Sequence, residues 1–179
     1  MRRVASRPLG EDGVSLVEVI LYSGLTALTL TVLGGVFAAG LQTQAAARDR
    51  DAAAGAAQVA TTSLQVGIHN ASAVLVTGNV LKARVATGTT GWQCAAWALT
   101  PDNKLVYRAE AGPITSTDYS AWTVLVAGAS GRLGGGAAFS GDSSQVSFSL
   151  GLGSGAATVP VAGVAVPGAY GPGSPVACW

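Results

Sequence analysis

The sequence predicts an α+β protein in which one long N-terminal helix precedes an antiparallel sheet of about six or seven strands. Residues 14–41 form an apolar run with a single charged residue, residues 42–70 are rich in helix formers, and from Ala71 onward apolar and polar residues alternate. Spacings of three and four are typical of a helix with one buried face, whereas alternation is typical of a strand with one buried face.

The apolar run is long enough to cross a membrane, and Glu18 is its one charged residue. At about 1.5 Å per residue the run spans roughly 40 Å, which exceeds the ~30 Å hydrocarbon core of a bilayer. A carboxylate inside such a span is costly unless it has a partner. We therefore expect Glu18 to have a functional role that a plain membrane anchor does not need.

The residues before the run are as informative as the run itself. Residues 1–13 form a short polar leader that contains three arginines and ends in Gly13, and Glu18 is the fifth residue after that glycine. Arginines before the span and none within it place the N-terminus in the cytoplasm. This pattern resembles the class III signal of type IV pilins and of the pseudopilins of type II secretion. Two features depart from the usual pattern of this family. The first residue after the glycine is Val14, where Phe is more usual. The proline that many major pilins have in mid-helix is absent, and Gly34-Gly35 lies near that place.

The resemblance implies a processing step and an assembly step. A prepilin peptidase cuts after Gly13 and methylates the new N-terminal amine of Val14. The carboxylate of Glu18 then pairs with the N-terminal ammonium of a neighbouring subunit as helices dock in the filament. The implied partners are the prepilin peptidase, other pilin subunits, an assembly platform membrane protein and, before assembly, membrane lipid. The chain is first a single-pass protein of the cytoplasmic membrane and then part of an extracytoplasmic pilus or pseudopilus.

Two other interpretations of the N-terminus fit less well. A cleaved secretory signal has an apolar region of about 7–15 residues and a small-x-small cleavage site. The run here is about twice as long, and residues 43–45 make a poor cleavage site. A simple signal anchor fits the length but leaves Glu18 unexplained.

Residues 42–70 are predicted to continue the same helix outside the membrane. Charged residues 48–51 mark the emergence from the lipid, and His69-Asn70 is a plausible helix end. Small and apolar residues at spacings of three and four then define one face suited to packing on a sheet: Ala53, Ala57, Ala60, Leu64 and Ile68.

Residues 71–179 are predicted to form the β-rich globular domain. Pro101-Asp102-Asn103 indicates a turn between two strands, and Pro160 indicates that the last strand lies at an edge. The Gly-rich stretch 128–141 is expected to be a mobile connection. The predicted strands are Ala73–Val76, Val80–Ala86, Trp92–Leu99, Lys104–Ala109, Trp122–Ala127, Gln145–Leu150 and Thr158–Val166.

The two cysteines, Cys94 and Cys178, both lie beyond the apolar run. If this part of the chain is exported, a disulfide is the expected state. Closing a loop of about 85 residues stabilises a fold by roughly 4–5 kcal/mol in the loop-entropy model. The alternative is a pair of free, buried thiols.

Little in the sequence favours an enzyme, a metal site or a bound cofactor. The single histidine, His69, stands at a predicted helix end without recognisable catalytic partners. Asp102, Asp118 and Asp142 all stand in turn contexts, and the two cysteines are too far apart in sequence for a zinc motif. Charged residues make up only 11% of the chain and the net charge is +1, so a nucleic acid is an unlikely partner.

The tryptophans leave a binding role open. Four are present, and they either form part of the core or make a surface for sugar or protein: Trp92, Trp97, Trp122 and Trp179. We therefore interpret the chain as a structural subunit of a type IV pilus-like filament, either a minor pilin or a pseudopilin. The alternative is a pilus-tip adhesin or a DNA-uptake pilin whose globular domain binds a ligand.

Overall fold

The computed structural model describes residues 13, 15–88, 91–153, 157–169 and 177–179. The chain divides into two compact units, residues 1–45 and 46–179. One helix, α1 (Leu16–His69), begins in the first unit and ends in the second. The described strands all lie in the second unit and pair antiparallel, so the predicted α+β class is confirmed.

The second unit is built on the last turns of α1. The five residues predicted to form its packing face, from Ala53 to Ile68, are the buried residues of this helix. Leu64 and Ile68 are fully buried, and the indole N–H of Trp97 donates a hydrogen bond of 2.8 Å to the hydroxyl of Ser63. Helix and sheet are therefore joined by apolar packing and by one side-chain hydrogen bond.

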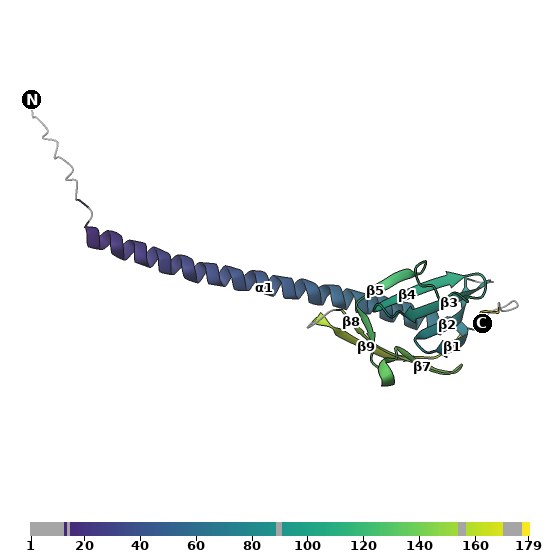
Figure 1. Cartoon of the computed structure of the whole chain (residues 1–179). Helices are drawn as coiled ribbons and strands as arrows, with labels where there is room; N and C mark the ends of the chain where they lie inside the picture. The colour runs from purple at the N-terminus through teal and green to yellow at the C-terminus, as the bar shows by residue number, and fades with distance from the viewer. Residues whose placement is uncertain (1–12, 14, 89–90, 154–156, 170–176) are drawn as a thin grey trace, which may run out of the picture. The chain divides into compact units, whose positions relative to one another are not determined.

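The first sheet is a five-stranded antiparallel meander (Figure 1). Its strands are adjacent in space in the order in which they follow in sequence, because each connection is a short turn or a single loop. At the turn after the third strand, Asn103 has a φ of 59°, a conformation that Asn tolerates better than most residues. The strands are β1 (Ala71–Thr77), β2 (Val80–Thr87), β3 (Gly91–Leu99), β4 (Lys104–Glu110) and β5 (Thr123–Ala127).

The central strand β3 is buried on both faces, as its sequence suggests. Ala95, Trp97 and Leu99 belong to the inner cluster, the large apolar core that includes the buried face of α1. The alternate residues of β3 face an outer cluster on the other side of the sheet, made by Cys94, Ala96, Ala98, Val106, Ile114, Trp122 and Cys178. Side chains alternate along a strand, so a strand covered on both sides is apolar at nearly every position.

A second sheet corrects the expectation of a single one. It is formed by β6 (Ala129–Gly131), β7 (Phe139–Gly141), β8 (Val146–Leu152) and β9 (Val159–Ala165), and β8 pairs with the other three (Figure 1). The described residues thus hold nine strands in two sheets instead of six or seven in one.

The glycine-rich stretch 128–141, which the sequence suggested to be a connection between strands, forms secondary structure of its own. It contains β6, β7 and a short 3₁₀ helix, η1 (Gly134–Gly136). Gly128, with a φ of 73°, turns the chain out of the first sheet, and an added Cβ would lie 2.9 Å from the carbonyl oxygen of Gly153. Strands of three residues are too short to show alternation, so their pairing depends on the longer partner β8.

The predicted disulfide is present. Cys94 and Cys178 are bonded, their Cα atoms are 5.4 Å apart, and both residues are buried. The bond holds the C-terminal residues against β3 in the outer cluster.

Candidate assembly site on the first turns of the long helix

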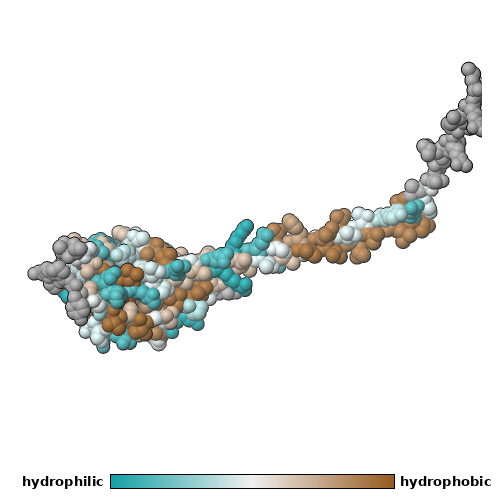
Figure 2. Space-filling model, turned by 180° about the vertical axis from the view of Figure 1, so that it is seen from behind, coloured by the Kyte–Doolittle hydropathy of each residue, from teal (hydrophilic) through white to brown (hydrophobic). Residues whose placement is uncertain are grey.

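The described part of the first unit is an exposed apolar helix. Every described residue from Gly13 to Ala45 is exposed, with Leu16 at 76% and Phe37 at 71%. Figure 2 shows hydrophobic residues in brown along this segment. An apolar surface of this extent is unstable in water, so it needs lipid or other protein around it. By length and hydropathy α1 is able to cross a membrane.

Several hydroxyl groups in this segment form hydrogen bonds within the helix. Four serine and threonine hydroxyls donate to a backbone carbonyl three or four residues earlier, which lowers the cost of placing them in lipid. The donors are Ser23 to Ile20, Thr29 to Leu25, Thr31 to Ala27 and Thr43 to Ala39. Glu18 remains the one charged residue between Ser15 and Ala45.

Glu18 lies in the first turn of α1. The carbonyl oxygen of Ser15 accepts hydrogen bonds from the backbone N–H groups of Glu18 at 2.9 Å and Val19 at 3.1 Å. The positive end of the helix dipole favours a carboxylate here by about 0.3–1 kcal/mol. Ser15 and Glu18 also have the spacing of a capping box, a signal that the sequence reasoning did not use. These local effects support Glu18 at the helix start but fall short of the cost of a lone charge in lipid.

The structure places two of the three predicted processing and assembly residues. Gly13 is exposed before α1, and an added Cβ would meet no atom of the described residues within 4 Å. Val14, the predicted new N-terminus, lies outside the described residues. Glu18 follows in the first turn of the helix.

Small residues shape the exposed apolar surface further along the helix. An added Cβ at Gly34 or Gly40 would meet no atom within 4 Å, so each leaves a notch beside Phe37. Together they form one side of a shallow groove lined by Leu30, Leu33, Gly34, Val36, Phe37, Gly40, Leu41 and Gln44. Small residues next to bulky ones let a second helix approach closely, which is the main source of helix association in lipid.

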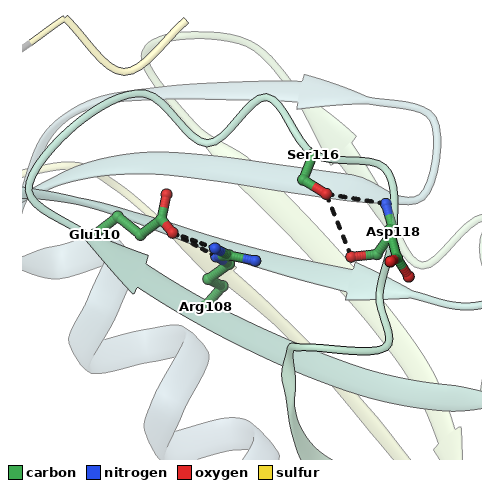
Figure 3. A network of polar contacts seen from close by, with 4 residues as sticks. All are labelled: Arg108, Glu110, Ser116 and Asp118. Carbon is green, nitrogen blue, oxygen red and sulfur yellow. Dashed lines mark hydrogen bonds and ion pairs between the residues drawn. The ribbon is translucent and has the colours of Figure 1, made fainter.

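The three candidate aspartates of the second unit each contact a residue two positions further along the chain, as their turn contexts suggest. Asp118 accepts hydrogen bonds from the backbone N–H and hydroxyl of Ser120, and these lower the pKa of its carboxyl. The backbone N–H of Asp118 in turn donates a hydrogen bond of 3.1 Å to the hydroxyl of Ser116 (Figure 3). Asp142 makes the same kind of turn with Ser144. Asp102 pairs with Lys104, which with other hydrogen bonds lowers its pKa to about 2.

The remaining candidates are the single histidine and the tryptophans. His69 is the last residue of α1, and its carbonyl oxygen accepts a hydrogen bond of 3.1 Å from the backbone N–H of Gly168. Trp97 and Trp122 lie in different clusters on the two sides of the first sheet, and Trp179 is half exposed. The described residues hold no group of three histidine, cysteine or acidic side chains that is able to bind a metal ion.

Comparison with known proteins adds no further constraint, since no family model, no curated protein and no solved structure matches this chain. The function is therefore inferred from the residues and their geometry.

Proposed function

We propose that this chain is a subunit of a type IV pilus-like filament, a minor pilin or a pseudopilin, that a prepilin peptidase processes after Gly13. The observation that supports it most is the exposed apolar helix with one carboxylate in its first turn, directly after a polar leader that ends in glycine. A plain anchor explains the apolar surface but not the carboxylate. A filament explains both, because neighbouring helices cover the apolar surface and a neighbouring ammonium neutralises Glu18.

In this proposal the two parts of α1 have different tasks. Residues 14–41 anchor the precursor in the cytoplasmic membrane with the N-terminus inside, and later pack in the filament. Residues from Ala53 to Ile68 fasten the globular unit to the same helix. The ion pair sets the register between neighbouring helices more than it strengthens their association. Each charge is costly alone in lipid, and pairing mainly cancels that cost.

Cleavage is the first test. Mass spectrometry of the protein purified from the membrane should find Val14 at the N-terminus, with or without an added methyl group. Gly13→Val should leave the precursor uncut, because a branched side chain obstructs the cleaved peptide bond. Gly24→Ala, a change at another exposed glycine, should be cut normally. A mature N-terminus near residue 45 would contradict the proposal, because it indicates a cleaved secretory signal.

Assembly is the second test. Glu18→Gln keeps the shape of the side chain and removes its charge, so this variant should be cut and inserted normally but should be depleted from filaments sheared off the cell. Ser23→Ala, which removes a hydroxyl already bonded within the helix, should assemble like the wild type. Wild-type incorporation of Glu18→Gln would refute the role of the ion pair.

A further inference from the structure

A polar groove lies on the outer side of the first sheet, away from the packing face of α1. It has a volume of about 490 Å³ and lies between strands β4 and β5 and the loop segment 117–122. We call it the outer groove. It belongs wholly to the second unit, and the assembly proposal does not involve it.

Charged groups of both signs line the outer groove. The ammonium of Lys104 lies 2.5 Å from a carboxylate oxygen of Asp102, and these side chains are 44% and 61% exposed. Asp118 contributes a second carboxylate, which accepts hydrogen bonds from the backbone N–H and hydroxyl of Ser120. Hydrogen bonds keep the pKa of both carboxyls below the usual value, so both are ionised at neutral pH. The groove therefore offers fixed acceptors and one strong donor.

An aromatic pair closes the same groove. The rings of Tyr119 and Trp122 meet edge to face, with centroids 5.2 Å apart. Tyr119 is half-buried, and Trp122 is only 5% exposed. The indole N–H of Trp122 is buried without a hydrogen-bond partner in the described chain, a state that costs about 1–3 kcal/mol. Trp122 therefore places a buried indole donor beside the groove.

The chemistry of the groove selects among ligand classes. Two carboxylates repel an anion, and each already lies near a cationic side chain that disfavours a further cation, Lys104 for Asp102 and Arg108 for Asp118. An apolar ligand would remove water from charged groups without replacing its hydrogen bonds. A neutral ligand with many hydroxyl groups donates to the carboxylates and accepts from Lys104, and its C–H face packs on an aromatic ring. We propose that the outer groove binds a neutral saccharide.

Trp122 provides a direct readout. The chain has four tryptophans and so four indole N–H signals in an NMR spectrum of the ¹⁵N-labelled full chain in detergent micelles. Probes are neutral monosaccharides with their short oligomers, plus sialic acid as the anion, spermidine as the cation and an uncharged pentapeptide. A neutral saccharide should shift the Trp122 signal saturably and leave the Trp97 signal unchanged, because Trp97 lies on the other face of the sheet. No saccharide shift at Trp122, or a shift with only the charged or peptide probes, would overturn the proposal.

The chain offers a matched pair of variants. Asp118 and Asp142 form the same aspartate–serine turn, but only Asp118 lines the outer groove. Asp118→Asn should weaken saccharide binding about tenfold, the loss expected for a charge-assisted hydrogen bond. Asp142→Asn should leave binding unchanged, and Tyr119→Leu should weaken it through the aromatic contact. Equal effects of the two Asn variants would place binding elsewhere and refute the outer groove.

Discussion

Gly67 allows a quantitative test of how α1 packs on the first sheet. A Cβ at this position would lie 2.3 Å and 2.4 Å from two ring carbons of Trp97, whose side chain is fully buried. No real contact is that short, so Gly67→Ala must displace the indole and stretch its hydrogen bond to Ser63. Gly55 lies on the same helix but is exposed, and its added Cβ would meet nothing within 4 Å.

The two glycines should respond with opposite signs. Replacing glycine by alanine inside a helix gains about 1 kcal/mol from propensity alone, which is the expected gain for Gly55→Ala. At Gly67 the same gain is outweighed by overpacking of about 1–3 kcal/mol and by a weakened hydrogen bond of about 1 kcal/mol. The net loss for Gly67→Ala is about 2 kcal/mol, and at roughly 3 °C per kcal/mol its Tm should fall by about 6 °C.

Thermal unfolding in detergent micelles measures this difference. Tryptophan fluorescence reports on the globular unit, because all four tryptophans lie in the second unit. In a Trp97→Leu background the cost of Gly67→Ala should shrink, since the obstructing ring is gone. An increase in Tm for Gly67→Ala, like that expected for Gly55→Ala, would refute the packing described between this helix and β3.

Two further predictions concern the globular unit. Cys178→Ser should lower the free energy of unfolding, measured by denaturant titration, by about 2–5 kcal/mol. Ser174→Ala is the control, because it leaves the disulfide intact. Equal stability of Cys178→Ser and the wild type would contradict a structural role of the bond. The pKa of Asp102 falls from 3.8 to about 2 on folding, so this carboxyl contributes stability that is complete above pH 3.8 and is lost as the pH falls toward 2. Asp102→Asn should therefore flatten the pH dependence of unfolding in that interval, and an unchanged slope would show that the ion pair with Lys104 does not contribute.

The sequence predicts the local elements well because their signals are local. The buried face of α1, the two faces of β3 and the turn at Asn103 follow from spacing and from residue type. The cysteine pairing was predictable because only two cysteines exist. For the assembly site, Glu18 was recognisable as a lone charge in an apolar run, and Gly13 as the last residue before it.

The parts that were not predicted depend on distant residues. β6 and β7 have three residues each and form only because β8 presents its backbone to both of them. The division into two sheets depends on Gly128, whose positive φ is not evident from a glycine-rich stretch. The outer groove needs the loop segment 117–122 to fold over β4 and β5, a long-range contact that no spacing in the sequence indicates.

The disulfide also limits how far the globular unit can lengthen under tension. It joins residues 84 positions apart, and the strands from β4 to β9 lie inside the loop that it closes. At about 3.4 Å per residue, this loop holds roughly 290 Å of extensible chain. A pull between the helix and the C-terminus passes through the sulfur atoms and bypasses that length. Only β1, β2 and the start of β3 can then unfold under the pull. The globular unit therefore lengthens by a short distance and then resists further extension.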